Sequence, residues 1–220
     1  NLTELISRTY LQGQHRGLPM LDKQWLLGRC EGLIALSGGR DGEMGQALLN
    51  NKAGEAKAAA EFWQQHFPDR FYLELQRTGR PGEEAYLHAA VALAQELQWP
   101  VVASNDVHFL QRNEFEAHEA RVCIHDGRTL DDPRRPRHYS EQQYLRTPQE
   151  MSVLFADIPE AIANSVAIAQ RCNLELTFGK NFLPDYPVPA GMSIEEFLAH
   201  DAEEGLEQRL QIILSGYAAH

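Results

Sequence analysis

Residues 71–82 read FYLELQRTGRPG, and this stretch decides how the chain folds. Its first five residues are aromatic or aliphatic apart from one glutamate, and a short apolar run bounded by turn residues is typical of a buried strand. The remainder contains Gly79, Pro81 and Gly82, which end a strand in a turn. The sequence therefore predicts a buried strand that opens into a polar loop at its carboxyl end.

Two other apolar runs have the same form. Residues 32–36 (GLIAL) lead into the loop SGG, and residues 101–103 (VVA) lead into the loop SND. Between the three runs, apolar residues recur at helical spacing. They are Ala56, Ala59, Ala60 and Trp63 in one helix and Leu87, Ala90, Val91, Ala94 and Leu97 in another. Strands that alternate with helices predict an α/β fold with parallel strands.

The second half of the chain is dominated by helix signals. One helical pattern covers residues 114–124 and ends at Asp126-Gly127, before the proline-rich loop DDPRRPRH. Thr147 then caps a helix with proline at its first position and Glu150 three residues after the cap. A further helix begins near residue 157 and runs to Asn173, and residues 181–192 form a proline-rich linker before a last helix capped at Ser193.

Composition narrows the class of protein. The 220 residues carry 20 Lys and Arg against 31 Asp and Glu, a net charge of −11 that disfavours long-range attraction to nucleic acid. No stretch approaches the roughly 20 apolar residues of a membrane span. Three widely spaced cysteines without a CxxC pattern argue against a disulfide framework or a zinc knot and favour a reducing cytoplasm. The chain starts at Asn1 in an amphipathic pattern without a signal peptide, which we interpret as an excision point.

One local region is basic. Five arginines and two histidines gather around the proline-rich loop, although aspartates and a glutamate are interleaved with them. The basic residues are Arg128, Arg134, Arg135, Arg137, Arg146, His125 and His138. We favour a solvated or partner-facing loop over a phosphate site, because the nearby carboxylates reduce the local positive charge.

Four segments give the chain a family resemblance. They read FPDRFYLELQRTGRP (67–81), VVASNDVHFL (101–110), AHEARVCIHDGRTLDDPRRPRHYS (117–140) and FADIPEAIANSVAIAQRCN (155–173). In order and separation they resemble the PHP domain of the alpha subunits of bacterial DNA polymerase III, the C-family replicative polymerases. The resemblance covers essentially the whole chain.

The resemblance implies a fold and a domain division. The fold is the C-terminal part of a distorted (β/α)7 PHP barrel followed by a mainly helical extension, in agreement with strands that open into polar loops. We expect residues 1–180 to be an incomplete PHP domain that lacks its N-terminal part. Residues 181–192 would be the linker, and residues 193–220 a helical segment that leads toward the polymerase palm.

The resemblance also implies an ancestral metal site. Asp106 and His108 match the last metal-binding motif of the family, Asp-x-His, and side chains two residues apart on an extended segment point to the same side. Two positions depart from the family pattern: Thr78 stands where metal-binding members have a histidine, and Gly39 stands where many have a cysteine. Arg77 adds a positive charge near this rim of the barrel. We therefore expect a vestigial, partly dismantled site.

These features lead to a functional hypothesis. The resemblance implies a largely non-catalytic scaffold that docks the proofreading exonuclease subunit, within a polymerase that contacts DNA only as the full-length protein. We expect no catalytic residue in the chain and no tightly bound cofactor. Mg²⁺ would belong to the palm, and Zn²⁺ or Mn²⁺ to an intact PHP site. The fragment itself would self-associate through unpaired strand edges. The alternative is a freestanding PHP-superfamily metallo-phosphoesterase.

Other conspicuous residues have structural interpretations. We expect His88 and His118 to make structural hydrogen bonds on their helices, beside Glu84 and Glu119. The flanking apolar residues predict core positions for Cys123 and Cys172, and the tryptophans should anchor helices and loops rather than stack on bases. The three tryptophans are Trp25, Trp63 and Trp99.

Overall fold

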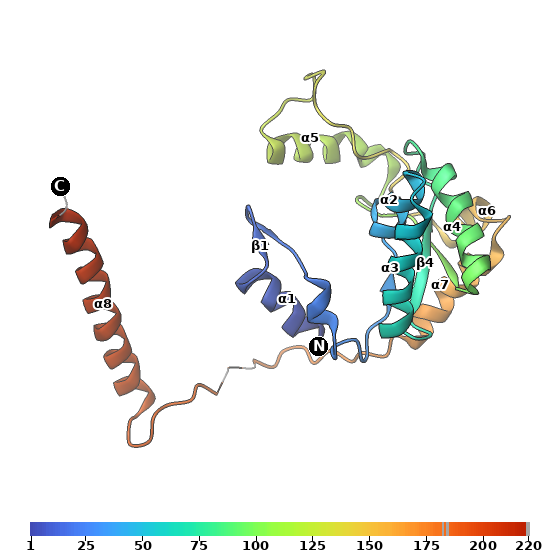
Figure 1. Ribbon diagram of the computed structural model, residues 1–220. Helices are drawn as coiled ribbons and strands as arrows, with labels where there is room; N and C mark the ends of the chain where they lie inside the picture. The colour runs from blue at the N-terminus through green and yellow to red at the C-terminus, as the bar shows by residue number, and fades with distance from the viewer. Residues whose placement is uncertain (182, 184, 219–220) are drawn as a thin grey trace. The chain divides into compact units, whose positions relative to one another are not determined.

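The computed structural model describes residues 1–181, 183 and 185–218 and divides the chain into two compact units, Asn1–Asn173 and Leu174–His220. The elements of the first unit, in order, are α1 (Leu2–Leu11), β1 (Gln14–His15), β2 (Leu18–Pro19), η1 (Lys23–Leu26), β3 (Ala35–Leu36), η2 (Gly39–Asp41), α2 (Glu43–Leu49), α3 (Ala53–His66), β4 (Phe71–Gln76), α4 (Glu83–Leu97), β5 (Val101–Ser104), η3 (Arg112–Glu114), α5 (Phe115–Asp126), α6 (Pro148–Leu154) and α7 (Pro159–Arg171). The second unit contains α8 (Ile194–Ala218). Figure 1 shows these elements along the chain.

A small parallel sheet forms the centre of the first unit. Its strand order is β3-β4-β5, with Leu36 beside Tyr72 and Leu73 beside Val101 in the register. The predicted α/β arrangement with parallel strands is confirmed, and the small sheet is that of a partial PHP barrel. The predicted strand 32–36 is shorter than expected, because only Ala35 and Leu36 pair with β4.

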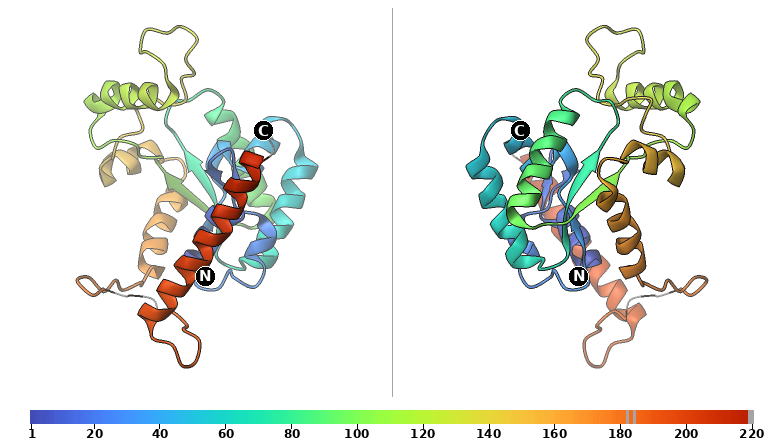
Figure 2. Two further views of the ribbon diagram at one scale, coloured as in Figure 1. Left: turned by 90° about the vertical axis from the view of Figure 1, so that its left-hand side faces the viewer. Right: turned by 90° about the vertical axis from the view of Figure 1, so that its right-hand side faces the viewer.

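Helices cover the strands. α4 packs on β4 and α7 packs on β5, while α2 contacts both α3 and α4. In the views of Figure 2 the strands lie between α7 and α3. The buried core brings together strand and helix side chains, among them Leu73, Leu75, Ala56, Ala60, Tyr86, Leu87, Ala90, Phe155 and Ala161. Burial of one such leucine or phenylalanine is worth about 1.5–3 kcal/mol, so the core holds the strand ends in fixed positions.

Aromatic side chains pack on the first residue of β4. The ring of Trp63 stacks on Phe71 with the centroids 5.2 Å apart, and the ring of Trp99 meets Phe71 edge-on at 5.1 Å. Trp25 is partly buried against the same core. The prediction that the tryptophans anchor helices and loops is confirmed.

Helix ends follow the capping signals in the sequence. The hydroxyl of Thr147 accepts a hydrogen bond from the backbone of Glu150, and the Glu150 carboxylate accepts one from the backbone of Thr147. Ser193 and Glu196 make the same reciprocal pair at the start of α8. Gly127 ends α5 in the left-handed conformation that a glycine adopts without strain. The predicted caps are confirmed.

Some sequence expectations are wrong. Cys123 is buried as predicted, but Cys172 is exposed because it lies just past the end of α7. Helix α2 and the β1-β2 hairpin were not predicted. Within the part of the chain that the structure describes, no helix has the length and apolar character to cross a membrane.

Candidate functional site

A polar pocket of about 530 Å³ lies at the carboxyl ends of the parallel strands. Its lining comes from the loops after β3, β4 and β5 and from a fourth segment, residues 137–140. That fourth segment reaches the rim because the chain pairs again beside β5: the amide of His108 donates to the carbonyl of Gln143, and the amide of Leu145 donates to that of Phe109. Each strand therefore delivers its following loop to one site, as the sequence predicts.

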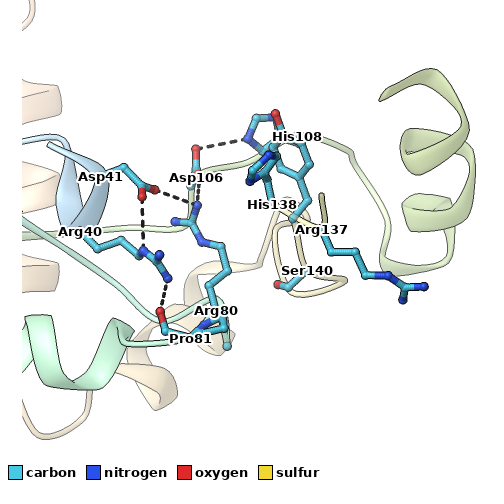
Figure 3. A pocket seen from close by; sticks show the side chains of 11 residues that line it. Arg40, Asp41, Arg80, Pro81, Asp106, His108, Arg137, His138 and Ser140 are labelled. Carbon is cyan, nitrogen blue, oxygen red and sulfur yellow. Dashed lines mark hydrogen bonds and ion pairs between the residues drawn. The ribbon is translucent and has the colours of Figure 1, made fainter. Parts of the chain in front are cut away.

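The guanidinium group of Arg80 lies among the acidic side chains of this rim (Figure 3). Its Nη1 is 3.2 Å from Asp41 Oδ2 and 3.3 Å from Asp106 Oδ2, and its Nε is 3.3 Å from Glu83 Oε1. Its Nη2 donates to Gln76 Oε1 at 2.8 Å. The side chain is only 10% exposed, so three carboxylates meet one nearly buried positive charge.

Glu83 fixes the loop after β4. Its carboxylate accepts hydrogen bonds from the backbone amides of Thr78 and Gly79 at 2.6 and 2.8 Å and from the Thr78 hydroxyl at 2.6 Å. Thr78 is fully buried, and Ser140 donates to its carbonyl from the fourth rim segment. Position 78, where the resemblance implies a histidine ligand, is therefore a threonine held inside the loop.

Asp106 and His108, the predicted ligand pair, do lie together. Their carboxylate and imidazole are 3.4 Å apart (Asp106 Oδ1 to His108 Nε2), and both line the pocket. The Asp106 carboxylate also accepts a hydrogen bond from Gln143 Nε2 at 2.8 Å and faces Arg80. The Asp106 carboxylate is thus already surrounded by His108, Gln143 and Arg80.

Gly39 stands where the resemblance implies a cysteine ligand, and the side chain of Gln76 lies against it. Gly39 has a left-handed φ of +58°, and a Cβ at this residue would lie 2.8 Å from Gln76 Oε1. The Gln76 amide is held by Arg80 and by Ser104. The space that a cysteine side chain would enter is therefore filled by a fixed amide.

These contacts test whether the residues present fit the metal that the family resemblance implies. Among residues 1–181, 183 and 185–218 no group of three or more His, Cys, Asp or Glu side chains has an arrangement that could hold a metal ion. Positively charged Arg80 lies where the carboxylates converge, Thr78 is buried in the loop, and Gln76 crowds Gly39. The residues of the rim therefore do not fit the metal.

Sequence reasoning identified the wrong arginine as the rim cation. Arg77 makes a bidentate pair with Asp157 at 2.6 and 2.8 Å and donates to the carbonyl of Leu154, so it connects β4 to the α6–α7 junction. This pairing lowers the pKa of Asp157 to about 2. Arg80, Glu83 and Asp41 were missed. Their only signal was the i,i+3 spacing of Arg80 and Glu83 at the start of a helix.

His118 also differs from its prediction. It is buried against the rings of His108 and Tyr139, at centroid distances of 5.3 and 4.7 Å, and its Nδ1 atom is buried without a hydrogen-bond partner. Burial, followed by the charges of His108 and Arg121, lowers its pKa. Glu119 pairs with Arg135 instead. The expected structural hydrogen bond of His118 is therefore absent at this atom, and packing holds the ring.

The basic loop is mostly paired with its own acidic residues. Arg128 and Arg134 both contact Asp132, at 3.2 and 3.4 Å. Arg146 donates to Asn105 and Gln142. Arg137 lines the pocket, but its guanidinium points away from the Arg80 cluster in Figure 3. These pairings favour the solvated or partner-facing interpretation over a phosphate site.

Comparisons with known proteins agree with the resemblance. The PHP domain family model matches residues 1–78. DNA polymerase III subunit alpha of Pseudomonas aeruginosa is 55% identical over 214 residues, and that of Escherichia coli is 54% identical over 213 residues. Each match covers 97% of this chain and 18% of the relative.

The alignment with these subunits includes the helical extension as well as the barrel segment. The chain spans about a fifth, 18%, of the length of the relatives it matches. A match over almost all of its residues favours the polymerase interpretation over a freestanding phosphoesterase. Over 97% of its length the chain is therefore similar to a segment of bacterial DNA polymerase III alpha subunits, and its first 78 residues match the PHP domain model.

Proposed function

We propose that this segment is a non-catalytic PHP scaffold within a replicative DNA polymerase that carries out template-directed DNA synthesis. The observation that carries the proposal is the rim, where the Arg80 guanidinium contacts Asp41, Glu83 and Asp106. Phosphoester cleavage by a polynuclear site needs metals that generate hydroxide and stabilise the leaving oxygen. A rim organised around an internal cation offers no such chemistry, but it gives the barrel segment a rigid edge.

The cofactor assignment follows from the same rim. We expect no tightly bound metal in this chain, Mg²⁺ at the palm of the full-length polymerase, and Zn²⁺ or Mn²⁺ only in relatives whose PHP site is intact. Metal analysis of protein purified without chelator tests this. About one zinc or manganese per chain that is lost in Asp106→Ala or His108→Ala would overturn it. We place the protein in the cytoplasm.

The proposed partner of the scaffold is the proofreading exonuclease subunit. A site that lacks its own hydrolytic metals leaves exonuclease chemistry to another chain, and a packed α/β unit is a stable platform for docking. Hydrogen exchange of the full-length alpha subunit, with and without the exonuclease subunit, tests this. We expect slower exchange on surfaces within residues 1–173. Protection confined to other parts of the subunit would exclude the docking role.

Contact with DNA is assigned to the rest of the polymerase. The chain has a net charge of −11, and most arginines of its basic loop are already paired with carboxylates. Affinity for duplex DNA depends on the number of phosphates that are neutralised. We expect no submicromolar dissociation constant for duplex DNA at moderate salt, as measured by fluorescence anisotropy on the isolated chain.

The isolated chain is also expected to self-associate. Within the described residues β3 pairs with β4 on one side only, and Leu36 at this edge is exposed. An unpaired strand edge is a template for pairing with another chain. Sedimentation velocity at increasing concentration should show a shift to larger species, and a constant monomer would contradict the expectation.

A further inference from the structure

Oxygen atoms surround the guanidinium group of Arg80. Its three nitrogen atoms contact only oxygen atoms at the rim, and these come from three carboxylates, one amide and one hydroxyl. Nε lies 3.0 Å from the Thr78 hydroxyl and 3.3 Å from Glu83, while Nη1 lies within 3.3 Å of both aspartates. The guanidinium group is therefore the point at which the oxygen ligands converge.

The nearby carboxylates favour a cation at this point. Glu83 is 3% exposed and Arg80 is 10% exposed, so their interaction is only weakly screened by water. If the guanidinium were removed, Glu83 and Asp106 would lose their shared positive partner, whereas Asp41 would keep Arg40, whose Nε lies 3.3 Å from Asp41 Oδ1. Removal of the guanidinium would therefore leave the buried carboxylate of Glu83 without the positive charge that compensates it.

We propose that Arg80 is the resident cation of the rim and excludes a divalent metal from it, so that loss of its side chain opens a site for Mg²⁺ or Mn²⁺. The class of ion follows from the ligands, because carboxylate and amide oxygens suit hard divalent cations. The inference deepens the scaffold function proposed above and rests on it for the absence of a native metal. This inference and the scaffold function can fail separately. One test counts bound cations, and the other measures whether the exonuclease subunit slows hydrogen exchange in residues 1–173.

The experiment counts Mn²⁺ bound to the full-length protein by electron paramagnetic resonance, with the parent protein as the reference for sites elsewhere in the chain. Arg80→Met removes the charge and keeps much of the volume. We expect it to bind one more Mn²⁺ per chain than the parent. Arg80→Lys keeps a cation and should gain none. Arg80→Met combined with Asp106→Asn removes a ligand and should lose the extra ion.

Three outcomes would overturn the proposal. The first is a folded Arg80→Met variant, checked by circular dichroism, that gains no Mn²⁺. The second is an extra ion that survives Asp106→Asn, since that ion would be bound elsewhere. The third compares the parent with Asp106→Asn and does not depend on whether Arg80→Met folds. Asp106→Asn alone should leave the number of bound Mn²⁺ unchanged, and a loss of one ion would mean that the native rim already holds a metal.

Discussion

Arg77 and Arg80 lie three residues apart in the loop after β4, yet their guanidinium groups face different regions of the molecule. Arg77 joins the end of β4 to the α6–α7 junction through Asp157 and the carbonyl of Leu154. Arg80 instead lies among the carboxylates of the pocket. The comparison shows that the role of an arginine in this loop cannot be read from its position in the sequence, because it depends on which carboxylates the fold brings to the guanidinium group.

The largest loss of stability is expected when the buried carboxylate of Glu83 is removed from the rim. We expect Glu83→Ala to lower the free energy of unfolding by about 3–5 kcal/mol, because it leaves the amides of Thr78 and Gly79 without their acceptor and removes the buried carboxylate that pairs with Arg80. Chemical denaturation measures this. The adjacent Glu84→Ala is the matched control, since Glu84 is 60% exposed, and it should cost less than about 1 kcal/mol. Equal losses in the two variants would contradict the assignment.

A smaller loss of stability is expected when Arg77 is removed from the α6–α7 junction. Arg77→Ala removes two charge-assisted hydrogen bonds to Asp157 and one to Leu154, together with packing over the ring of Phe155. We expect a loss of about 2–3 kcal/mol, because such bonds to charged groups contribute about 1.5–3 kcal/mol and Asp157 is largely exposed. Arg112→Ala, at an exposed ion pair with Glu141, is the control. If Arg77→Ala and Arg112→Ala lose the same free energy of unfolding, the contacts of Arg77 contribute no more than an exposed ion pair.

A still smaller loss of stability is expected at the start of α6, the helix whose last residue, Leu154, accepts a hydrogen bond from Arg77. Thr147→Ala removes the capping hydroxyl of α6 and should cost about 1 kcal/mol. Ser152→Ala is the control, because Ser152 lies inside the same helix and its hydroxyl is bonded only to the carbonyl of Pro148. If both serine and threonine variants lose the same stability, the cap does not contribute to the junction.

The smallest effect concerns pH. Arg77 depresses the pKa of Asp157 from 3.8 to about 2, so the folded state favours the charged carboxylate more than the unfolded state does. The resulting stability is present above pH 4 and is lost as the pH falls toward 2. The stability difference between the parent and Asp157→Asn should therefore shrink over that range. In an Arg77→Ala background the shrinkage should disappear, and its persistence would assign the effect to another group.

The sequence predicts the strands and helix ends well because their signals are local. The run FYLEL and the caps at Thr147 and Ser193 each depend on a few adjacent residues, and each is present in the structure. The strand at residues 32–36 was overestimated, since the length of a strand depends on how many residues find a partner, and β4 offers only two here. Cys172 was placed in the core from its apolar neighbours, although it lies beyond the end of α7.

The rim could be predicted only in part. Asp106 and His108 share a short motif, so their proximity follows from spacing. The cation among them could not be foreseen, because Arg77 and Arg80 have the same chemistry and only the path of the loop decides which one enters the pocket. Burial of Glu83 likewise depends on Thr78 and Ser140, which come from loops 62 residues apart.

Gly39 and Gln76 leave little room for a metal ligand at position 39. A cysteine introduced there would adopt a left-handed backbone conformation and place its Cβ 2.8 Å from the amide oxygen of Gln76. That amide cannot withdraw without giving up its bonds to Arg80 and Ser104. The effect of a cysteine at position 39 thus depends on the residue at position 76 and its partners. Such a ligand added alone would cost stability, and a compensating change at Gln76 would have to come first.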